Sequence, residues 1–273
     1  MTVRHILFGA VSAVALIATP SLAEDQSILV QSTTSTQNSG LYDYLLPIYQ
    51  AETGVKVNVV AVGTGQAIKN AENCDADVLF VHAKAAEEKF VASGYGVKRF
   101  GLMYNDFIIV GPAADPAGIN GGKDAAAALV TIADKKALFA SRGDDSGTNK
   151  AELALWAETP VDPAAASGDW YRVTGSGMGA TLNASVGMGA YTLTDRATWI
   201  SFGNKGDFKI EVEGDPKLFN QYGVTLVNKD KCPSVKTDLG QQFIDWLISE
   251  HGQKIIADYK VDGQQLFFPN AGQ

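Results

Sequence analysis

Residues 55–67 read VKVNVVAVGTGQA, a valine-rich run of alternating side chains that ends in a Gly-Thr-Gly turn. The alternation predicts a β-strand over residues 55–62, and the residues after the turn, 66–73, suit a helix. Glycines in such a turn let backbone N–H groups come close to a ligand. The stretch therefore predicts a strand-turn-helix unit of an α/β sheet, with a polar turn at the end of the strand.

The same order of strand and helix recurs on both sides of this stretch. Strand patterns occupy residues 27–32, 77–81 and 105–111, and helical spacing occupies residues 41–53 and 84–93. A second series follows, with helices expected over 123–136, 147–158, 181–188, 195–199, 235–249 and 252–257, and strands over 137–141, 171–173, 191–193, 208–212 and 224–227. This alternation predicts an α/β fold whose sheets are mainly parallel and flanked by helices.

The chain is longer than one compact domain usually is, with about 250 residues after its N-terminal segment. No linker of low complexity divides it, so the chain is expected to cross between two lobes along ordered segments near residues 104–111 and 221–227. The first lobe would be discontinuous, formed by residues 24–106 and 225–273, and the second would be formed by residues 107–224. A cleft between the lobes would be lined by loops at the strand ends, where open α/β sheets bind ligands.

The N-terminal segment predicts export. Arg4 and His5 precede an apolar run over residues 6–18, and Ser21-Leu22-Ala23 has the small-x-small pattern of a signal peptidase site. We therefore expect residues 1–23 to be a signal peptide and the mature chain to be periplasmic. The formal charge of −8 argues against nucleic acid or an anionic membrane as a partner.

Two cysteines, Cys74 and Cys232, lie far apart in the sequence. An oxidising compartment favours a disulfide between them, and two buried free thiols are the alternative. A zinc site is not expected, because no histidine or cysteine partners lie nearby.

Four polar turns carry the candidate site. The first turn (residues 32–36) offers hydroxyls before a helix that Asn38 or Ser39 could cap, and we expect Thr33, Thr34 and Ser35 to bind a ligand. Simple capping of the helix is the alternative. The second turn (residues 63–65) contributes Thr64 and Gly65, but it matches neither a dinucleotide fingerprint nor a nucleotide P-loop.

The third turn (residues 141–148) is the richest in donors. Arg142 supplies a planar, permanently charged fork that suits a tetrahedral oxyanion, and Ser146, Gly147 and Thr148 begin a helix. Asp144 and Asp145 would repel an anion if they pointed inward, so one is expected to cap the helix and the other to orient Arg142 or backbone amides. The alternative is a surface bridge between arginine and aspartate beside a capped helix.

The fourth turn (residues 175–179) and the helix after it contribute Gly177 and Thr181 as further candidates. This turn can hold an anion or allow close helix packing, and its residues leave both readings open. Arg196 is expected to form a structural ion pair.

No recognised catalytic motif occurs. His82 is expected to be a hydrogen-bonded core residue and His251 a surface residue. A serine hydrolase that uses Ser146 with His82 is the enzymatic alternative. We expect no enzyme activity, no metal and no cofactor.

In these residues the chain resembles the tungstate-binding proteins of bacterial ABC uptake systems. The resemblance covers essentially the whole mature chain, in order, through residues 32–41, 63–67, 77–83, 141–148, 177–179 and 191–196. It implies a two-lobed periplasmic binding protein fold of type II that closes over a tetrahedral oxyanion and delivers it to a membrane permease, as a monomer. The Cys74 and Cys232 pair departs from the family pattern.

The residue chemistry fits such a ligand, because hydroxyls and amides donate hydrogen bonds and favour a fully deprotonated oxyanion. Tungstate and molybdate differ too little for the residues to separate them. A receptor for phosphate or sulfate is the alternative.

Overall fold

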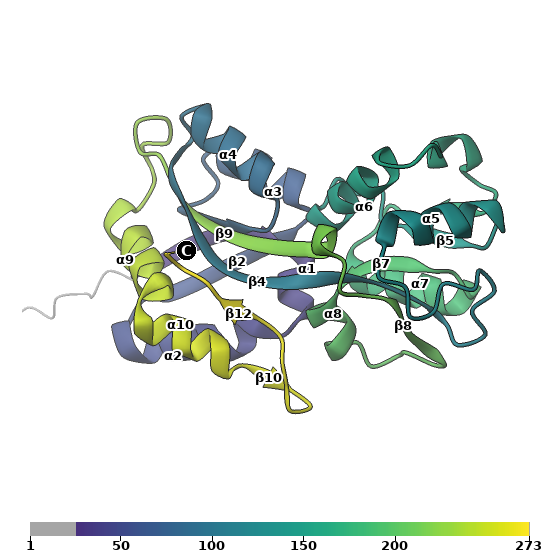
Figure 1. The fold of residues 1–273 in the computed structure, drawn as a ribbon. Coiled ribbons are helices and arrows are strands. Elements are labelled where there is room, and N and C mark those ends of the chain that lie inside the picture. Colours follow the sequence, from purple (N-terminus) through teal and green to yellow (C-terminus); the bar gives the residue numbers. More distant parts are fainter. Residues whose placement is uncertain (1–25, 273) are drawn as a thin grey trace, which may run out of the picture.

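The computed structural model describes residues 26–272, so the predicted signal peptide over residues 1–23 lies outside the described part. Two lobes lie side by side, and the long strands β4 (Gly96–Pro112) and β9 (Phe219–Val227) run from one to the other (Figure 1). Among the described residues, no helix combines the length and the apolar character needed to cross a membrane. The lobe boundaries given above stay a prediction.

The first lobe combines the N-terminal elements with the C-terminal helices. Its elements are β1 (Ser27–Thr33), α1 (Thr34–Asn38), α2 (Leu41–Thr53), β2 (Lys56–Val62), α3 (Thr64–Glu72), β3 (Val78–Val81), α4 (Lys84–Ala92), α9 (Thr237–Ile248), α10 (Glu250–Asp258), β10 (Lys260–Val261), β11 (Gln264–Gln265) and β12 (Phe268–Pro269). The second lobe contains α5 (Ala125–Asp134), β5 (Phe139–Ser141), α6 (Gly147–Ala157), β6 (Tyr171–Val173), α7 (Met178–Met188), β7 (Thr192–Asp195), α8 (Arg196–Ser201) and β8 (Phe208–Val212), with short 3-10 turns at Pro163–Ala166 and Pro216–Leu218.

The central sheet is mixed, which differs from the mainly parallel sheet expected. Its order is β12-β4-β9-β3-β1-β2, and β1 runs parallel to β2 and β3. Strand β9 is antiparallel to both β3 and β4, and β7 and β8 are antiparallel to β4. The physical reason is the crossover, because β4 carries the chain out of the first lobe and β9 carries it back in the opposite direction.

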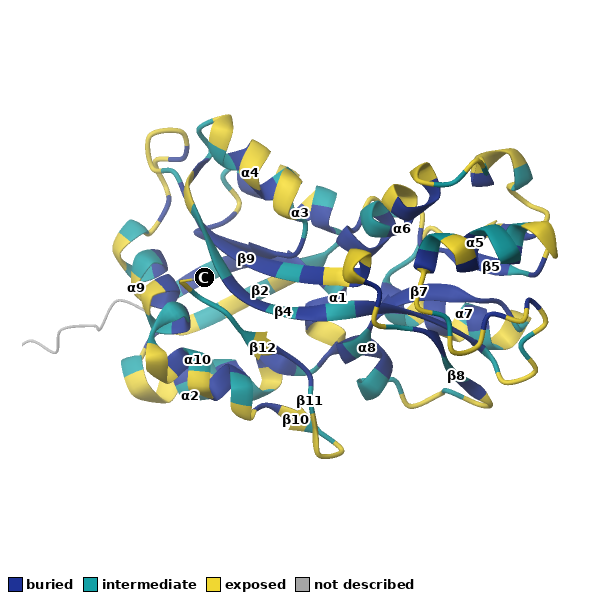
Figure 2. Cartoon of the chain, viewed as in Figure 1, coloured by how far each residue is buried: buried dark blue, intermediate teal, exposed yellow. Residues whose placement is uncertain are grey.

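The hydrophobic core is divided between the two lobes. One cluster in the first lobe packs the strands against α2, α9 and α10, with Leu45, Phe80, Phe243 and Ile256 fully buried. Two further clusters fill the second lobe, one around Phe139 and the other around β4, α7 and α8. Figure 2 shows buried residues along the strands and exposed residues on the outer helix faces. Each lobe therefore has its own apolar interior, and the polar turns lie where the lobes meet.

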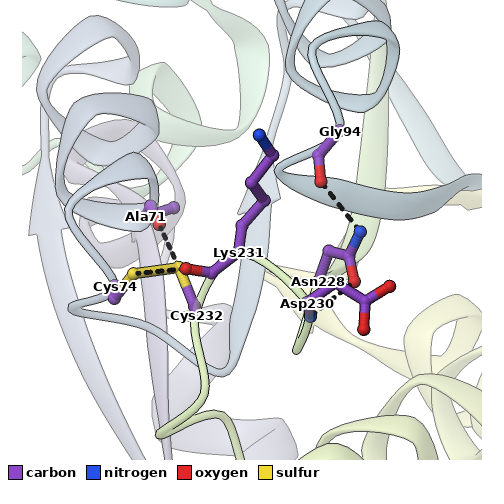
Figure 3. Close-up of a disulfide and its surroundings, with 7 residues drawn as sticks. All are labelled: Ala71, Cys74, Gly94, Asn228, Asp230, Lys231 and Cys232. Carbon is purple, nitrogen blue, oxygen red and sulfur yellow. Dashed lines mark hydrogen bonds between the residues drawn. A yellow bond between two sulfur atoms is a disulfide. The ribbon is translucent and has the colours of Figure 1, made fainter.

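The predicted disulfide is present. Cys74, after α3, is bonded to Cys232, in the segment that leads to α9 (Figure 3). Cys232 is fully buried, and the bond joins two parts of the first lobe that are 158 residues apart in the sequence.

We expect the double substitution Cys74→Ser and Cys232→Ser to lower the free energy of unfolding by about 2–5 kcal/mol, because the bond closes a long loop in the unfolded chain. Urea titrations of oxidised wild type and of the variant measure the difference. Equal midpoints, or two free thiols in unfolded and unreduced wild type, would contradict this prediction.

His82 follows β3 in a buried polar junction between the crossing strands. Its Nδ1 lies 3.0 Å from Asn220 Oδ1 on β9, and Asn220 Nδ2 donates to Asn105 Oδ1 on β4 at 2.7 Å. The imidazole stacks on Tyr222 with ring centroids 4.7 Å apart. Burial lowers the pKa of His82 to about 4. The prediction of a hydrogen-bonded core histidine is therefore confirmed.

This histidine should make folding sensitive to acid. The folded state keeps His82 neutral until about pH 4, whereas the unfolded chain takes up the proton near its usual pKa of 6.5. Wild type should therefore lose up to about 3 kcal/mol of stability relative to His82→Gln as the pH falls through this window, and none above it. Urea unfolding of both proteins between about pH 7.5 and pH 4 checks this. A stability difference that stays constant with pH would show that His82 is not held neutral.

Candidate functional site

The four polar turns meet at the boundary between the lobes. The first turn joins β1 to α1 and the second joins β2 to α3, both in the first lobe. The third joins β5 to α6 and the fourth precedes α7, both in the second lobe. Helix α1 contacts α7 and α8 across the boundary (Figure 1). The crossing of β4 and β9 thus brings turns from distant parts of the sequence to one place.

Arg142 reaches from the second lobe into the first turn. Its Nη1 donates to Ser35 Oγ at 3.0 Å, and its Nη2 donates to Thr34 Oγ1 at 3.1 Å. The Nη2 group also lies 2.5 Å from Asp144 Oδ2. The arginine is 2% exposed, which rules out the surface bridge considered from the sequence. Its Nε is buried and has no partner among the described residues, so the guanidinium retains donors for a ligand.

The first turn begins a short helix, and this differs from the expected loop. Thr33 is the N-cap of α1, since its Oγ1 accepts from Thr36 N at 3.3 Å. Asn38 or Ser39 was expected to cap the following helix, but Gly40 is the N-cap of α2. The prediction fails because the polar stretch itself forms α1, so that Asn38 is the last residue and Ser39 the C-cap of that helix, and neither begins the next one. Thr34 and Ser35 then face Arg142.

Four hydroxyls at the boundary accept a hydrogen bond from the protein. Thr34 and Ser35 accept from Arg142, Thr64 Oγ1 accepts from Gly147 N at 2.9 Å, and Ser146 Oγ accepts from Asn149 N at 3.1 Å. None of the four donates to another described residue. A hydroxyl whose lone pair is engaged in this way can direct its hydrogen to a ligand.

Thr148 adds a fifth hydroxyl, because its Oγ1 is buried without a partner among residues 26–272. We name these residues the donor cluster, which consists of Thr34, Ser35, Thr64, Arg142, Ser146 and Thr148. Other predicted residues have different contacts. Gly65 N donates to Asp145 O at 3.2 Å, and a Cβ on Gly65 would lie 1.7 Å from Asp145 Oδ2, so only glycine allows this approach of the turns.

The remaining predicted residues do not belong to the donor cluster. The amide of Gly147 is engaged by Thr64, and Thr33 caps α1. Thr181 Oγ1 lies 2.9 Å from Thr174 Oγ1 within the second lobe. Gly177 is the N-cap of α7, and a Cβ there would lie 3.3 Å from Thr34 Oγ1. The fourth turn therefore packs closely against the first.

The two aspartates of the third turn have different orientations. Asp144 accepts from Arg142 and from Ser146 N at 3.3 Å. It therefore orients the arginine, which is one of the two roles expected for these aspartates. Asp145 is mostly exposed and pairs with Lys150. The expectation that one aspartate caps α6 is wrong, because Ser146 is the N-cap. Asp145 is therefore turned away from the cluster, whereas the negative charge of Asp144 lies beside Arg142 and is balanced by it.

Sequence reasoning missed two buried carboxylates beside the cluster. Asp195, the N-cap of α8, accepts from Thr198 N at 2.8 Å and from Thr198 Oγ1 at 2.7 Å. Burial raises the pKa of Asp195, and the charge of Arg142 opposes that rise. Glu152 on α6 is 2% exposed and accepts from Ser141 Oγ. The spacing between Asp195 and Thr198 is typical of a helix N-cap and could have identified Asp195 from the sequence. Nothing in the sequence marks Glu152 as buried.

The surroundings of Ser146 do not form a hydrolase site. His82 Nδ1 is engaged by Asn220, and His82 has no hydrogen bond to Ser146. A groove of about 460 Å³ lies nearby, lined by His82, Phe107 and Phe219 among others, but it contains no member of the donor cluster. Within residues 26–272, no group of histidine, cysteine and carboxylate side chains could hold a metal ion. Arg196 pairs with Asp106 and Glu213, so its predicted structural role is confirmed.

Several known proteins are similar to this chain in sequence and in fold. The domain profile of the PBP superfamily matches residues 18–251. The tungstate-binding protein TupA of Peptoclostridium acidaminophilum is 48% identical over 251 residues, which are 90% of this chain and 87% of that protein. Among solved structures, the tungstate-binding protein TupA from Desulfovibrio alaskensis G20 is 48% identical with a TM-score of 0.75, and the match covers 90% of this chain and 99% of that one. The tungstate ABC transporter structure from Geobacter sulfurreducens is 50% identical with a TM-score of 0.78, over 86% of this chain and 99% of that one. The predicted fold class is confirmed, and the chain belongs to the PBP superfamily and, within it, to the family of the TupA proteins.

Proposed function

We propose that this protein is an extracytoplasmic receptor that captures tungstate, and also molybdate, and delivers it to an ABC permease. The observation that carries the proposal is the donor cluster, in which hydroxyl hydrogens and the Nε of Arg142 lack acceptors among the described residues. A group of buried donors without acceptors suits an anion. Membership of this superfamily supports a transport receptor rather than an enzyme.

The strength of binding follows from the number of donors. A dianion loses its hydration when the lobes enclose it, and this is unfavourable unless hydrogen bonds replace the lost water. Each charge-assisted hydrogen bond contributes about 1.5–3 kcal/mol. The donor cluster offers five hydroxyls and one guanidinium, and hydrogen bonds of Arg142 to Thr34 and Ser35 and of Gly147 N to Thr64 join its two sides. An oxyanion in contact with all of them would therefore favour the closed arrangement of the lobes.

The charge state of the ligand follows from the acceptors. Hydrogen phosphate carries a proton that needs an acceptor. Asp144 is paired with Arg142 and accepts from Ser146 N, Asp145 pairs with Lys150, and Asp195 accepts from Thr198, so each carboxylate already has protein donors and is a weaker acceptor for that proton. A fully deprotonated oxyanion needs no acceptor. This supports tungstate, molybdate or sulfate over phosphate, and the names of the relatives favour tungstate among the three.

The proposed partner follows from the relatives of this chain, and the proposed compartment follows from its N-terminal sequence. One related structure is named as that of a tungstate ABC transporter, which supports a permease as the partner of this chain. The sequence pattern over residues 1–23 supports export by a signal peptide, and we propose a monomeric receptor.

Isothermal titration of the purified mature chain with tungstate, molybdate, sulfate and phosphate tests the function. We expect tungstate and molybdate to bind at least about tenfold more tightly than sulfate and phosphate. Tighter binding of phosphate, or no heat with any oxyanion, would overturn the proposal. Competition between tungstate and molybdate in the same cell ranks the two.

Arg142→Ala should weaken tungstate binding about 100-fold, because it removes the one arginine of the donor cluster and its charge-assisted bonds. The matched control is Arg172→Ala, which removes the same charge from an exposed position on the nearby strand β6. The control should bind tungstate as wild type does. Equal loss in both variants would mean that net charge, rather than the contact, matters.

A further inference from the structure

Glu152 is a buried carboxylate that the proposed function does not use. It lies on α6, directly behind the third turn, and is 2% exposed. Its Oε2 accepts from Ser141 Oγ at 2.7 Å, and its Oε1 accepts from Tyr171 OH at 2.6 Å and from Trp156 Nε1 at 3.1 Å. Three donors from three elements, β5, β6 and α6, thus converge on one side chain.

The bond to Ser141 matters because Ser141 directly precedes Arg142 in the chain. The backbone of Ser141 is held as well, since Thr174 N donates to Ser141 O at 2.9 Å. The far end of the third turn is held by Asn149, which accepts from Asp145 N at 3.3 Å and donates through its N–H to Ser146 Oγ at 3.1 Å. Two residues on α6, Asn149 and Glu152, therefore fix both ends of the turn that carries the arginine.

We propose that Glu152 is the positioning residue for Arg142: it holds Ser141 at the end of β5, so that the guanidinium projects between the lobes toward Thr34 and Ser35. This rests on the proposed function of Arg142 as an oxyanion ligand. The side chain of Glu152 makes no hydrogen bond to a member of the donor cluster among the described residues, since its bonds go to Ser141, Tyr171 and Trp156. Its effect on the ligand passes through the backbone of the third turn.

Two substitutions of Glu152 distinguish the effect of its hydrogen bonds from the effect of its negative charge. In Glu152→Gln, the amide oxygen can accept from Tyr171 and Trp156, and the amide nitrogen can donate to Ser141 Oγ. The shape and the contacts are kept while the negative charge is lost. Glu152→Ala removes the contacts and leaves three buried donors without their acceptor.

The experiment compares tungstate affinities of these variants by isothermal titration, with circular dichroism and thermal melting to select folded protein. Glu152→Ala should weaken binding about tenfold, and Glu152→Gln should rescue affinity to within about threefold of wild type. Equal losses in both variants would overturn the positioning role, because charge would then be the cause. Affinity unchanged in Glu152→Ala would overturn it as well.

A double-mutant cycle distinguishes positioning of Arg142 from general support of the lobe. If Glu152 acts through Arg142, adding Glu152→Ala to Arg142→Ala should weaken the remaining affinity less than about twofold. A full tenfold loss in that background would overturn the proposal. If Arg142→Ala binds too weakly to measure, a second cycle uses Ser141→Ala instead. Because Glu152 would act through Ser141, the double variant should lose no more tungstate affinity than the more impaired of the two single variants.

Glu211 on β8 supplies the matched control. It is another buried glutamate of the second lobe, 1% exposed, and its side chain makes no hydrogen bond with the described residues. Glu211→Ala should leave tungstate affinity unchanged, and a tenfold loss there would show that any buried glutamate of this lobe affects binding. Wild type that binds no tungstate would refute the proposed function, whereas wild type that binds, with Glu152→Ala unaffected, would refute only this inference.

Discussion

Burying the Arg142 guanidinium between the lobes removes it from water, and each of its N–H groups then needs an acceptor. Asp144 compensates its charge from the same turn, while Ser35 and Thr34 accept from the opposite lobe. The arginine is therefore tied to both lobes at once. Its Nε has no acceptor among the described residues and is one of the donors that we propose for the anion. The contact between the lobes and the proposed anion site thus involve the same group.

The crossing strands make this arrangement possible. Because β4 continues from the first lobe into the second and β9 returns beside it, both lobes share one sheet and need no flexible linker. The His82 junction with Asn220 and Asn105 lies on these strands, close to where the chain changes lobe. The hydrogen bonds of Asn220 to His82 and to Asn105 join β9 to its neighbours at this junction and favour one register of the strands. The register in turn sets which turns face each other.

Much of the fold could be predicted from local patterns, and the exceptions have physical causes. Strand 208–212 and the helix that begins at Gly147 follow from periodicity and capping alone. Strand β4 begins at Gly96, whereas the sequence pattern predicted a start near residue 105. Its first residues mix charged and apolar side chains on a half-exposed part of the sheet, so no clear alternation marks them as a strand. Strand direction was not predictable, since periodicity does not reveal which strand is the partner.

The candidate site shows the same limit more sharply. Thr34, Ser35 and Arg142 could be identified from hydroxyl-rich turns, because a ligand of this kind requires those donors. Their roles depended on orientation, which the sequence does not contain. Asp144 and Asp145 are neighbours with the same chemistry, yet one is turned to Arg142 and the other to Lys150. Glu152 had no local signal, because its partners Ser141 and Tyr171 come from separate strands.

An acidic chain that binds a dianion cannot rely on its long-range field. With a formal charge of −8, the field of the whole molecule repels the ligand at a distance, so electrostatic steering does not accelerate encounter. Short-range donors must then supply the affinity by slowing dissociation. The proposed site, with one arginine and hydroxyls from both lobes, meets that demand. Hydroxyls donate without adding charge, and their orientation by protein donors such as Gly147 N and Asn149 N is fixed before the anion arrives.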